Sequence, residues 1–442
     1  VIYFLFAYSY IMKEKFIKST IILIIGGLLT KILGMVIRIV TTRVIGLEGI
    51  GLYMLVMPTY SLFITIATLS LPIAISKLVS ENTRNNKNVI LGIIPIALLF
   101  NIIVITILIL SSKFISNTLL QNSKLYYPIL AMSVTLPFIT LSSIIRGYFF
   151  GRQKMIPHVT SNLFEQIVRL AMTIIITPYL LKFGIISAVT GLILFNVVSE
   201  LLSIFILFFF MPKNVKITKN DLKPDYDNVK DLFSISFPTT TGRIISSIGG
   251  FLEPIVITFV LLAIGYNNDY ITMEYGIISG YVFPMVMLPQ FLSGAVSSAL
   301  LPTISSYNAL NMKKAIKRKL YQAISFSLLI GIFFTIIFMI FPELSLKIMF
   351  NETEGAKYLF FAAPIFLLTY IQGPIVSTLQ AIDEAKIVMN SSLIGVVVKT
   401  IVLFFSLYLD IHMYALLIAI FIQYLIVTIY QYKKLKKVLN TK

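Results

Sequence analysis

Two basic side chains lie within the first long apolar segment of the chain, residues 16–43. Lys31 and Arg38 are seven positions apart. Seven residues make two turns of an α-helix, so both side chains project from one face. A charged residue at the centre of a membrane-spanning helix costs about 2.5–3.5 kcal/mol to insert. We therefore expect this face to avoid lipid and to line a wet cavity for a negatively charged group.

Seven more charged residues occupy the apolar segments. With Lys31 and Arg38 they give six basic and three acidic side chains, an excess of three positive charges. Guanidinium groups bind phosphate oxygens in a bidentate manner, so this excess favours an anionic, phosphate-bearing ligand. A carrier of cationic compounds should instead hold unpaired carboxylates. The seven residues are Arg146, Glu165, Arg169, Glu200, Arg243, Glu253 and Lys399.

Four of the nine charges are predicted to bind the ligand. For Lys31, Arg38 and Arg243 the alternative is snorkelling, in which the charged head reaches the membrane surface. Glu253 lies deep in its segment, beside a proline. We expect it to pair with an arginine of the first span and to release that arginine alternately. The alternative for Glu253 is a static ion pair.

The other five charges are predicted to have structural or gating roles. Glu165 and Arg169 are four residues apart, so they can pair along one helix face. Arg146 and Arg152 are expected to assist that pair at the cytoplasmic side, and contact with the substrate is the alternative. Glu200 and Lys399 are single charges in their segments; a pair between them is one option, and the sequence assigns a partner to neither.

The composition identifies a polytopic membrane protein. The chain has 442 residues, of which 58% are hydrophobic and 12% charged, and its mean hydropathy is +0.93. Soluble domains are about 25% charged. Absence of cysteine and the presence of two histidines argue against a metal site, and we expect no cofactor. The net charge of +18 is attributed to loop lysines rather than to nucleic-acid binding.

Twelve apolar runs are long enough to cross a bilayer as helices. If the amino terminus is cytoplasmic, inner segments carry 24 Lys and Arg residues and outer segments carry 6. This bias obeys the positive-inside rule, so we expect a multi-pass protein of the cell membrane with both termini cytoplasmic. The runs are residues 16–42, 52–76, 89–111, 125–150, 156–181, 184–211, 231–264, 276–307, 321–342, 358–382, 387–409 and 411–432.

The predicted organisation is two six-helix lobes. Residues 13–211 form the N-terminal lobe, residues 212–230 a cytoplasmic linker and residues 231–432 the C-terminal lobe. Residues 1–12 are apolar but too short to span, so we interpret them as an upstream extension. Residues 433–442 form a basic cytoplasmic tail.

The two halves resemble each other weakly. A shift of 215 residues places Gly34 on Gly249 and Arg38 on Glu253. Internal repeats in transporters indicate a central binding site, and chance similarity is the alternative here. Two repeats that start on the same side of the membrane predict a parallel repeat.

Four stretches together resemble a known family. They are TKILGMVIRIVTTRVIGLEGIGLY (30–53), LPIAISKLVSE (71–81), RGYFFGRQKMIPHVTSNLFEQIVR (146–169) and LLP (300–302). The chain resembles the stage V sporulation protein B group of polysaccharide transporters. This group belongs to the multidrug/oligosaccharidyl-lipid/polysaccharide (MOP) exporter superfamily, with the lipid II flippases. The resemblance covers residues 13–440 and is most specific in the third stretch.

The resemblance implies an all-α fold similar to MATE transporters and lipid II flippases. About twelve transmembrane helices would form two six-helix lobes in a V shape around a central cavity, worked by alternating access. Many members have fourteen spans, whereas twelve are predicted here. The substrate implied by the resemblance is a sugar attached to a polyprenyl pyrophosphate.

We therefore expect a flippase that moves an anionic lipid-linked sugar or peptidoglycan precursor across the cytoplasmic membrane, in cell-wall or polysaccharide biosynthesis or sporulation. The alternatives are a MATE-type multidrug or cation antiporter and, from another class, a membrane glycosyltransferase. We expect no enzymatic activity. Because the nucleotide-binding pattern GxxxxGK[ST] is absent, coupling to the membrane potential or to an ion, proton or sodium, is expected instead of ATP. The expected partners are the substrate and membrane lipids, without nucleic acid, and the expected state is a monomer.

Overall fold

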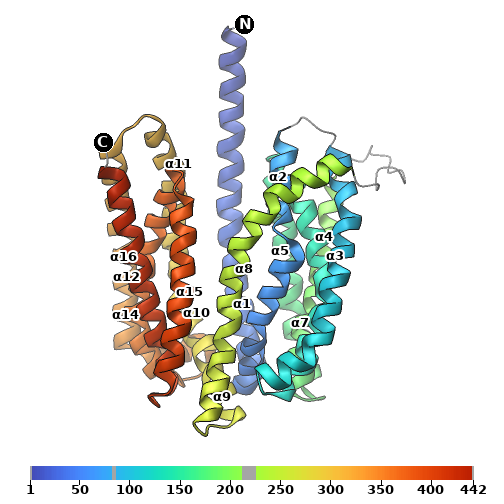
Figure 1. Cartoon of the computed structure of the whole chain (residues 1–442), viewed down its shortest axis with the longest axis vertical. Helices are drawn as coiled ribbons and strands as arrows, with labels where there is room; N and C mark the ends of the chain where they lie inside the picture. Colours follow the sequence, from blue (N-terminus) through green and yellow to red (C-terminus); the bar gives the residue numbers. More distant parts are fainter. Residues whose placement is uncertain (1, 82–85, 212–224, 441–442) are drawn as a thin grey trace. The chain divides into compact units, whose positions relative to one another are not determined.

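The computed structural model describes residues 2–81, 86–211 and 225–440, and in these ranges it is built of helices without a β-strand (Figure 1). The first half contains α1 (Ile2–Thr68), α2 (Leu71–Ser80), α3 (Asn86–Phe114), η1 (Ile115–Leu119), η2 (Ser123–Leu125), α4 (Tyr126–Gly151), α5 (Met155–Ile175), α6 (Thr177–Leu181) and α7 (Ile185–Phe209). The second half contains α8 (Tyr226–Ala263), α9 (Asn268–Gly276), η4 (Ile277–Val282), α10 (Phe283–Met287), α11 (Gln290–Ala309), α12 (Lys313–Ile340), α13 (Pro342–Phe350), α14 (Ala356–Ala381), α15 (Ala385–Leu407) and α16 (Tyr414–Asn440).

Large apolar side chains cover the outside of several helices. Leu99 and Leu110 on α3 are 65% and 78% exposed, and Leu329 on α12 is 67% exposed. Hydrocarbon surface of this extent is unfavourable in water but not against lipid tails. Nine helices of the described ranges are long and apolar enough to cross a membrane, and the bent pair Asn268–Met287 and Gln290–Ala309 forms a tenth span.

The remaining two predicted spans lie in α1 and α5. The helix α1 contains the first span and much of the second, because its backbone breaks at Gly46, where φ is +65°. Glycine adopts that left-handed value without a steric cost. In α5, polar side chains lower the mean hydropathy, so this helix is not among the nine helices counted above. The expectation of an all-α membrane protein with about twelve transmembrane helices is confirmed.

The helices gather into two compact units. The division falls inside α8, after Ser247. The predicted linker, 212–230, lies mostly outside the described residues, so the predicted lobe boundaries stay a prediction. The N unit contains residues 1–45, 59–118 and 122–247, and the C unit contains residues 46–58, 119–121 and 248–442.

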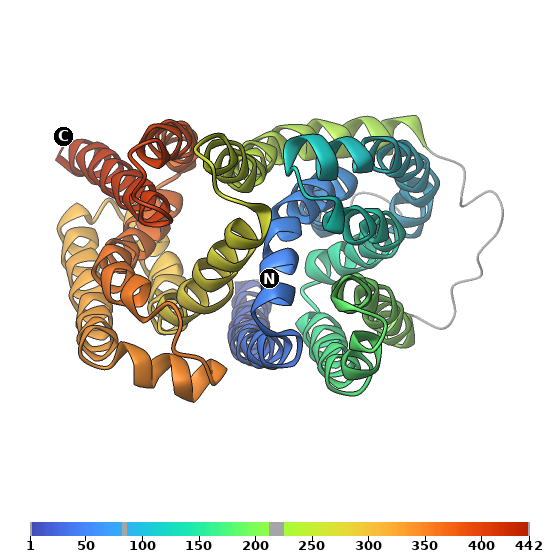
Figure 2. The same ribbon diagram turned by 90° about the horizontal axis from the view of Figure 1, so that it is seen from below.

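The same order of helix packing occurs in each unit. In the N unit, α4 packs against α2, α3 and α7, and α7 packs against α5. In the C unit, α14 packs against α11, α12 and α16, and α16 packs against α15. Figure 2 shows many of the helices of each unit nearly end-on. Because helices at corresponding positions make corresponding contacts, the packing supports the internal repeat.

Two glycines correct the register of that repeat. A Cβ atom on Gly26 would lie 2.4 Å from Val159 of α5, and one on Gly249 would lie 2.4 Å from Val396 of α15. Both glycines therefore allow the first helix of a half to approach the fifth closely. This equivalence pairs Gly249 with Gly26 rather than with Gly34, about two turns earlier. The predicted alignment of Arg38 with Glu253 in the repeat is therefore wrong, since Thr30 takes the position equivalent to Glu253.

The second span of each half is broken. Leu69 and Ser70 have φ values of +45° and +50°, which are unfavourable for residues with a side chain. The corresponding span of the C unit bends by 51° before Gln290. Prolines follow or occupy both breaks, Pro72 within the first turn of α2 and Pro289 before α11. A proline therefore accompanies the break in each of the two spans.

Polar side chains donate hydrogen bonds to backbone carbonyl groups beside the break in the second span of the N unit. Asn101 Nδ2 of α3 and Thr140 Oγ1 of α4 donate to the Ala67 carbonyl over 3.3 and 3.4 Å. The Ser236 hydroxyl of α8 donates to the Leu69 carbonyl. Backbone carbonyls in an apolar layer need such partners because water does not reach them. Three other helices thus stabilise the break.

Candidate functional site

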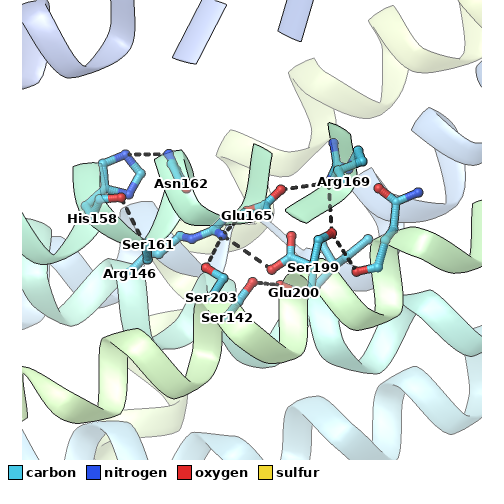
Figure 3. A network of polar contacts seen from close by, with 12 residues as sticks. Ser142, Arg146, His158, Ser161, Asn162, Glu165, Arg169, Ser199, Glu200 and Ser203 are labelled. Carbon is cyan, nitrogen blue, oxygen red and sulfur yellow. Dashed lines mark hydrogen bonds and ion pairs between the residues drawn. The ribbon is translucent and has the colours of Figure 1, made fainter. Parts of the chain in front are cut away.

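A cluster of four charges lies inside the N unit, between α4, α5 and α7 (Figure 3). Arg146 Nη2 donates to Glu165 Oε2 over 2.7 Å, to Glu200 Oε2 over 3.3 Å and to the Ser203 hydroxyl over 2.8 Å. Arg169 Nη2 donates to Glu165 Oε1 over 2.7 Å. The predicted pair of Glu165 and Arg169, assisted by Arg146, is confirmed. Arg152, which was also expected to assist, takes no part in these contacts.

The cluster is buried and electrically neutral. Both glutamate side chains are 7% exposed, and the Arg146 and Arg169 side chains are 16% and 23% exposed. Two positive and two negative charges cancel, so each charge has a partner in a medium that solvates it poorly. An additional hydroxyl, that of Ser142, lies against Glu200 (Figure 3). These features indicate ion pairs and hydrogen bonds that hold three helices together, rather than a binding site for a charged ligand.

The periodicity of α5 explains how one helix supplies so much of this cluster. Its polar residues His158, Asn162, Glu165 and Arg169 recur at intervals of three or four, which places them on one face. His158 Nε2 and Asn162 Nδ2 are 3.3 Å apart on that face (Figure 3). Apolar residues such as Phe164, which is 51% exposed, lie elsewhere on the helix. The amphipathic pattern therefore directs the charges towards α4 and α7.

A second ion pair lies inside the C unit. Lys399 Nζ of α15 donates to Glu253 Oε2 of α8 over 2.6 Å, and both side chains are 12% exposed. The Tyr275 hydroxyl donates to Glu253 Oε1 over 3.0 Å. In this structure a lysine of the same unit lies against Glu253, which agrees with the alternative of a structural ion pair. The exchange of Glu253 with an arginine of the first span stays a prediction. The possible ion pair of Lys399 with Glu200 is wrong, because Lys399 contacts Glu253 and Glu200 contacts Arg146.

The three predicted ligand-binding bases all belong to the N unit. Lys31 on α1 is exposed, and Arg38, two turns further along, is half-buried. Arg243 on α8 is exposed, and its Nη1 atom lies 3.5 Å from the hydroxyl of Ser70 at the broken span. Their role in ligand binding stays a prediction.

The ion pairs show where the excess positive charge lies. All three span glutamates contact a basic residue, namely Arg146, Arg169 or Lys399. In the described ranges, no salt bridge is formed by Lys31 or Arg243 with these glutamates. Lys31 and Arg243, which take no part in these pairs, both belong to the N unit.

Sequence reasoning missed the polar residues that support these groups. Tyr275 was not assigned to Glu253, and Asn101, Thr140 and Ser236 were not assigned to the helix break. Asn101 was recognisable in principle, because it is the single amide within the long apolar run of α3. The partner of each polar group depends on packing between helices that are distant in sequence.

Comparison with known proteins places the chain in a family. The sequence profile described as "Polysaccharide biosynthesis protein" matches residues 16–308. The chain belongs to this family. A second profile, MatE, matches residues 276–405. The expected resemblance to the stage V sporulation protein B group and to the MOP superfamily is confirmed.

Two curated relatives come from Bacillus subtilis (strain 168). Stage V sporulation protein B is 35% identical over 402 residues, which cover 89% of this chain and 78% of the relative. Lipid II flippase MurJ is 25% identical over 437 residues, which cover 88% of this chain and 77% of the relative. Both alignments extend over most of each sequence, so they support a common architecture for the whole chain.

Solved structures share the fold at lower sequence identity. A multidrug resistance MATE family transporter of the MOP superfamily, in an inward-facing conformation, has a TM-score of 0.74 at 15% identity and covers 93% of this chain and 94% of its own. Lipid II flippase MurJ, in an inward closed conformation, has a TM-score of 0.72 at 17% identity and covers 93% of this chain and 87% of its own. These two similarities establish the fold of this chain but not its substrate.

Proposed function

We propose that the protein is a flippase that moves an anionic, polyprenyl-pyrophosphate-linked sugar or peptidoglycan precursor across the cytoplasmic membrane by alternating access. Residues 13–211 and 231–432 would act as the two moving lobes, with both termini in the cytoplasm. The protein would act on its substrate without changing its covalent structure.

The observation that carries this proposal is the sign of the charge left over after the span glutamates are paired. Lys31 and Arg243 provide two positive charges in the N unit that the span glutamates do not pair, and Arg38 is a third basic side chain of this unit. A pyrophosphate offers several anionic oxygens, which guanidinium and ammonium groups bind through charge-assisted hydrogen bonds. These three residues are therefore proposed as the binding groups for the head of the lipid.

The positive sign of this charge disfavours the main alternative, which is the export of cationic drugs. An antiporter of cations needs a carboxylate that is available to the substrate, whereas Glu165, Glu200 and Glu253 already contact basic residues. The relatives named for sporulation and lipid II transport are consistent with an anionic lipid substrate. A glycosyltransferase has no support from the relatives described above.

Arg243 also connects the proposed binding groups to a deformable helix. Its guanidinium group lies 3.5 Å from Ser70, at the break in the second span. An anion that attracts Arg243 would withdraw it from this hydroxyl. Substrate binding is therefore proposed to remove the contact between Arg243 and Ser70 at the break. A ligand shifts a conformational equilibrium only if the contacts differ between the two states.

The ion pair of the C unit is proposed as the place where an ion is coupled. Glu253 and Lys399 are the charged residues of the predicted spans in this unit. The Lys399 ammonium group lies 2.6 Å from the carboxylate, in the position that a bound metal cation would take. This occupancy favours a proton over sodium, because protonation of Glu253 would release Lys399 without a second cation.

Native mass spectrometry of the protein extracted from its own membrane tests the substrate class. We expect a co-purifying species with the mass of a polyprenyl pyrophosphate bearing one or more sugars, and its loss in a variant with both Arg38→Ala and Arg243→Ala. A co-purifying organic cation would contradict the proposal and favour the MATE-type antiporter. Membrane insertion of the variant is checked by its elution as a single species in size-exclusion chromatography.

A further inference from the structure

A pocket of about 510 Å³ lies at one end of the C unit, where α9, α13, α14 and α16 meet. The helix α9 is labelled in Figure 1. Pockets that bind small organic molecules have volumes of about 300–1,000 Å³ and are rich in aromatic side chains. The residues of interest in its wall are Tyr270, Glu274, Glu343, Glu354, Tyr358 and Tyr414.

Three tyrosines line the pocket together with Glu274. The Tyr358 hydroxyl donates to Glu274 Oε2 over 2.6 Å, and the Tyr358 and Tyr414 rings lie 4.7 Å apart between centroids. Tyr270 is one turn before Glu274 on α9, on the same face. Its hydroxyl is fixed 2.9 Å from His412 Nδ1. The pocket therefore combines a carboxylate with aromatic rings that are held in position.

The rim adds two carboxylates, Glu343 and Glu354. Both are exposed, and in the part of the chain that the structure describes neither forms an ion pair or hydrogen bond. They do not cap helices either, since the N-cap residues of α13 and α14 are Phe341 and Gly355. Ion pairing therefore does not account for these two negative charges. Glu343 lies in the first turn of α13, where the helix dipole favours a carboxylate, so Glu354 is the charge without a local structural explanation.

The charge of the pocket opposes that of the whole protein. Its lining holds three glutamates and one lysine, Lys357, so its formal charge is negative, whereas the chain carries +18. A pyrophosphate would be repelled here, which separates this pocket from the proposed lipid-binding groups of the N unit. A metal ion is also disfavoured, because no cluster of His, Asp and Glu among the described residues has the arrangement of a metal site.

We propose that this pocket binds the ammonium group of a small organic ligand. The face of a tyrosine ring carries a negative partial charge that attracts a cation, and aromatic rings together with carboxylates form the usual recognition site for organic ammonium groups. Tyr270, Tyr358 and Tyr414 supply the rings, and Glu274 and Glu354 supply the negative charge. A neutral amide in place of the ammonium group would lose both attractions, because it carries no positive charge.

The predicted topology places this end of the C unit outside the cell. The binding site itself does not depend on that topology or on the proposed transport, because binding is measured without translocation. A failure of the flippase proposal would appear as the absence of a bound polyprenyl lipid. A failure of the pocket would appear only in the titration described next.

The test is a titration of the full-length protein in phosphatidylcholine nanodiscs, followed by calorimetry and saturation-transfer NMR. Glucosamine is compared with N-acetylglucosamine, and Nα-acetyl-lysine amide with its Nε-acetylated form. In each pair, acetylation removes the positive charge and retains the rest of the molecule. We expect the charged member to bind at least about tenfold more tightly, as is typical of hydrogen bonds and contacts to a charged group. The stronger of the two charged ligands identifies an amino sugar or an amine-bearing peptide as the source.

Three variants assign the binding to this pocket. Glu354→Gln removes a charge from an exposed side chain and should weaken the charged ligand about tenfold with unchanged thermal stability. Glu274→Gln should weaken it at least as much. Glu81→Gln, at an exposed glutamate of the N unit, is the matched control and should have no effect. Equal binding of charged and acetylated ligands, unchanged binding in both pocket variants, or no binding at all would overturn the proposal.

Discussion

The buried arginine of the N unit gives the most demanding prediction. Arg146 contacts Glu165, Glu200 and Ser203 through one guanidinium nitrogen. The substitution Arg146→Ala removes all three contacts and leaves two glutamates, each 7% exposed, with one remaining arginine. Removing one partner of a buried ion pair lowers the free energy of unfolding by about 3–5 kcal/mol, because the other charge stays buried without compensation.

This loss is large enough to measure by thermal unfolding in detergent. In a unit of roughly 200 residues, each kcal/mol changes Tm by about 2–4 °C, so Arg146→Ala should lower Tm by about 6–20 °C. The sequence contains no tryptophan, so a fluorescent-protein fusion followed by size-exclusion chromatography after heating is the suitable assay. The substitution Arg146→Lys should fall between wild type and alanine, because an ammonium group does not reproduce the planar guanidinium geometry.

A double variant separates charge balance from a general effect on packing. Combining Arg146→Met with Glu200→Gln leaves the neutral pair of Glu165 and Arg169 at 2.7 Å. We expect this double variant to be more stable than Arg146→Met alone, which is a non-additive result typical of contacting residues. A Tm within about 2 °C of wild type for Arg146→Ala would refute the reasoning. So would a double variant whose loss equals the sum of the two single losses.

Three further predictions concern transport and the helix break. Arg38→Ala or Arg243→Ala should abolish translocation of a fluorescent lipid-linked sugar in proteoliposomes, while the protein stays inserted and stable. Glu253→Gln should lower thermal stability because it leaves Lys399 buried without its carboxylate, and Glu253→Gln with Lys399→Met should restore stability but not ion-dependent transport. Asn101→Leu should lower the free energy of unfolding by about 1–3 kcal/mol, measured as a lower Tm, because a carbonyl of the helix break loses a donor.

Each of these predictions has a control within the chain. Lys113→Ala, at an exposed base of the N unit, should leave translocation unchanged, and full activity in both arginine variants would contradict the basic-site proposal. Ion-dependent transport in the double variant of the C-unit pair would exclude that pair from coupling. Thr106→Val, at an exposed hydroxyl bonded within its own helix, should leave Tm unchanged. A similar loss in Thr106→Val would show that the effect of Asn101→Leu is not specific to the break.

Local sequence was sufficient for the features that depend on composition or helical spacing. Apolar runs of span length predicted the membrane fold, because a bilayer requires about twenty apolar residues per crossing. The pair of Glu165 and Arg169 followed from a spacing of four, which the helix geometry alone brings together. The assistance of this pair by Arg146 was also expected, whereas the contact of Arg146 with Glu200 was not.

Tertiary structure decided which helices supply the partners of the other charges. Glu253 was expected to meet an arginine of the first span, yet it meets Lys399, 146 positions along the chain. The repeat register was also corrected by packing, because Gly26 and Gly249 are equivalent through the valines that they contact in other helices. Spacing within one helix carries no information on the rotation of its neighbours.

The sequence by itself thus determined that Lys31, Arg38 and Arg243 are charges in apolar segments, and that the spans carry more positive than negative charge. Only the tertiary structure decided that the span glutamates are already paired, which leaves Lys31 and Arg243 of the N unit outside these pairs. The physical reason is that a buried charge is stabilised by the nearest opposite charge in space. That distance is set by helix packing, which brings together residues far apart along the chain.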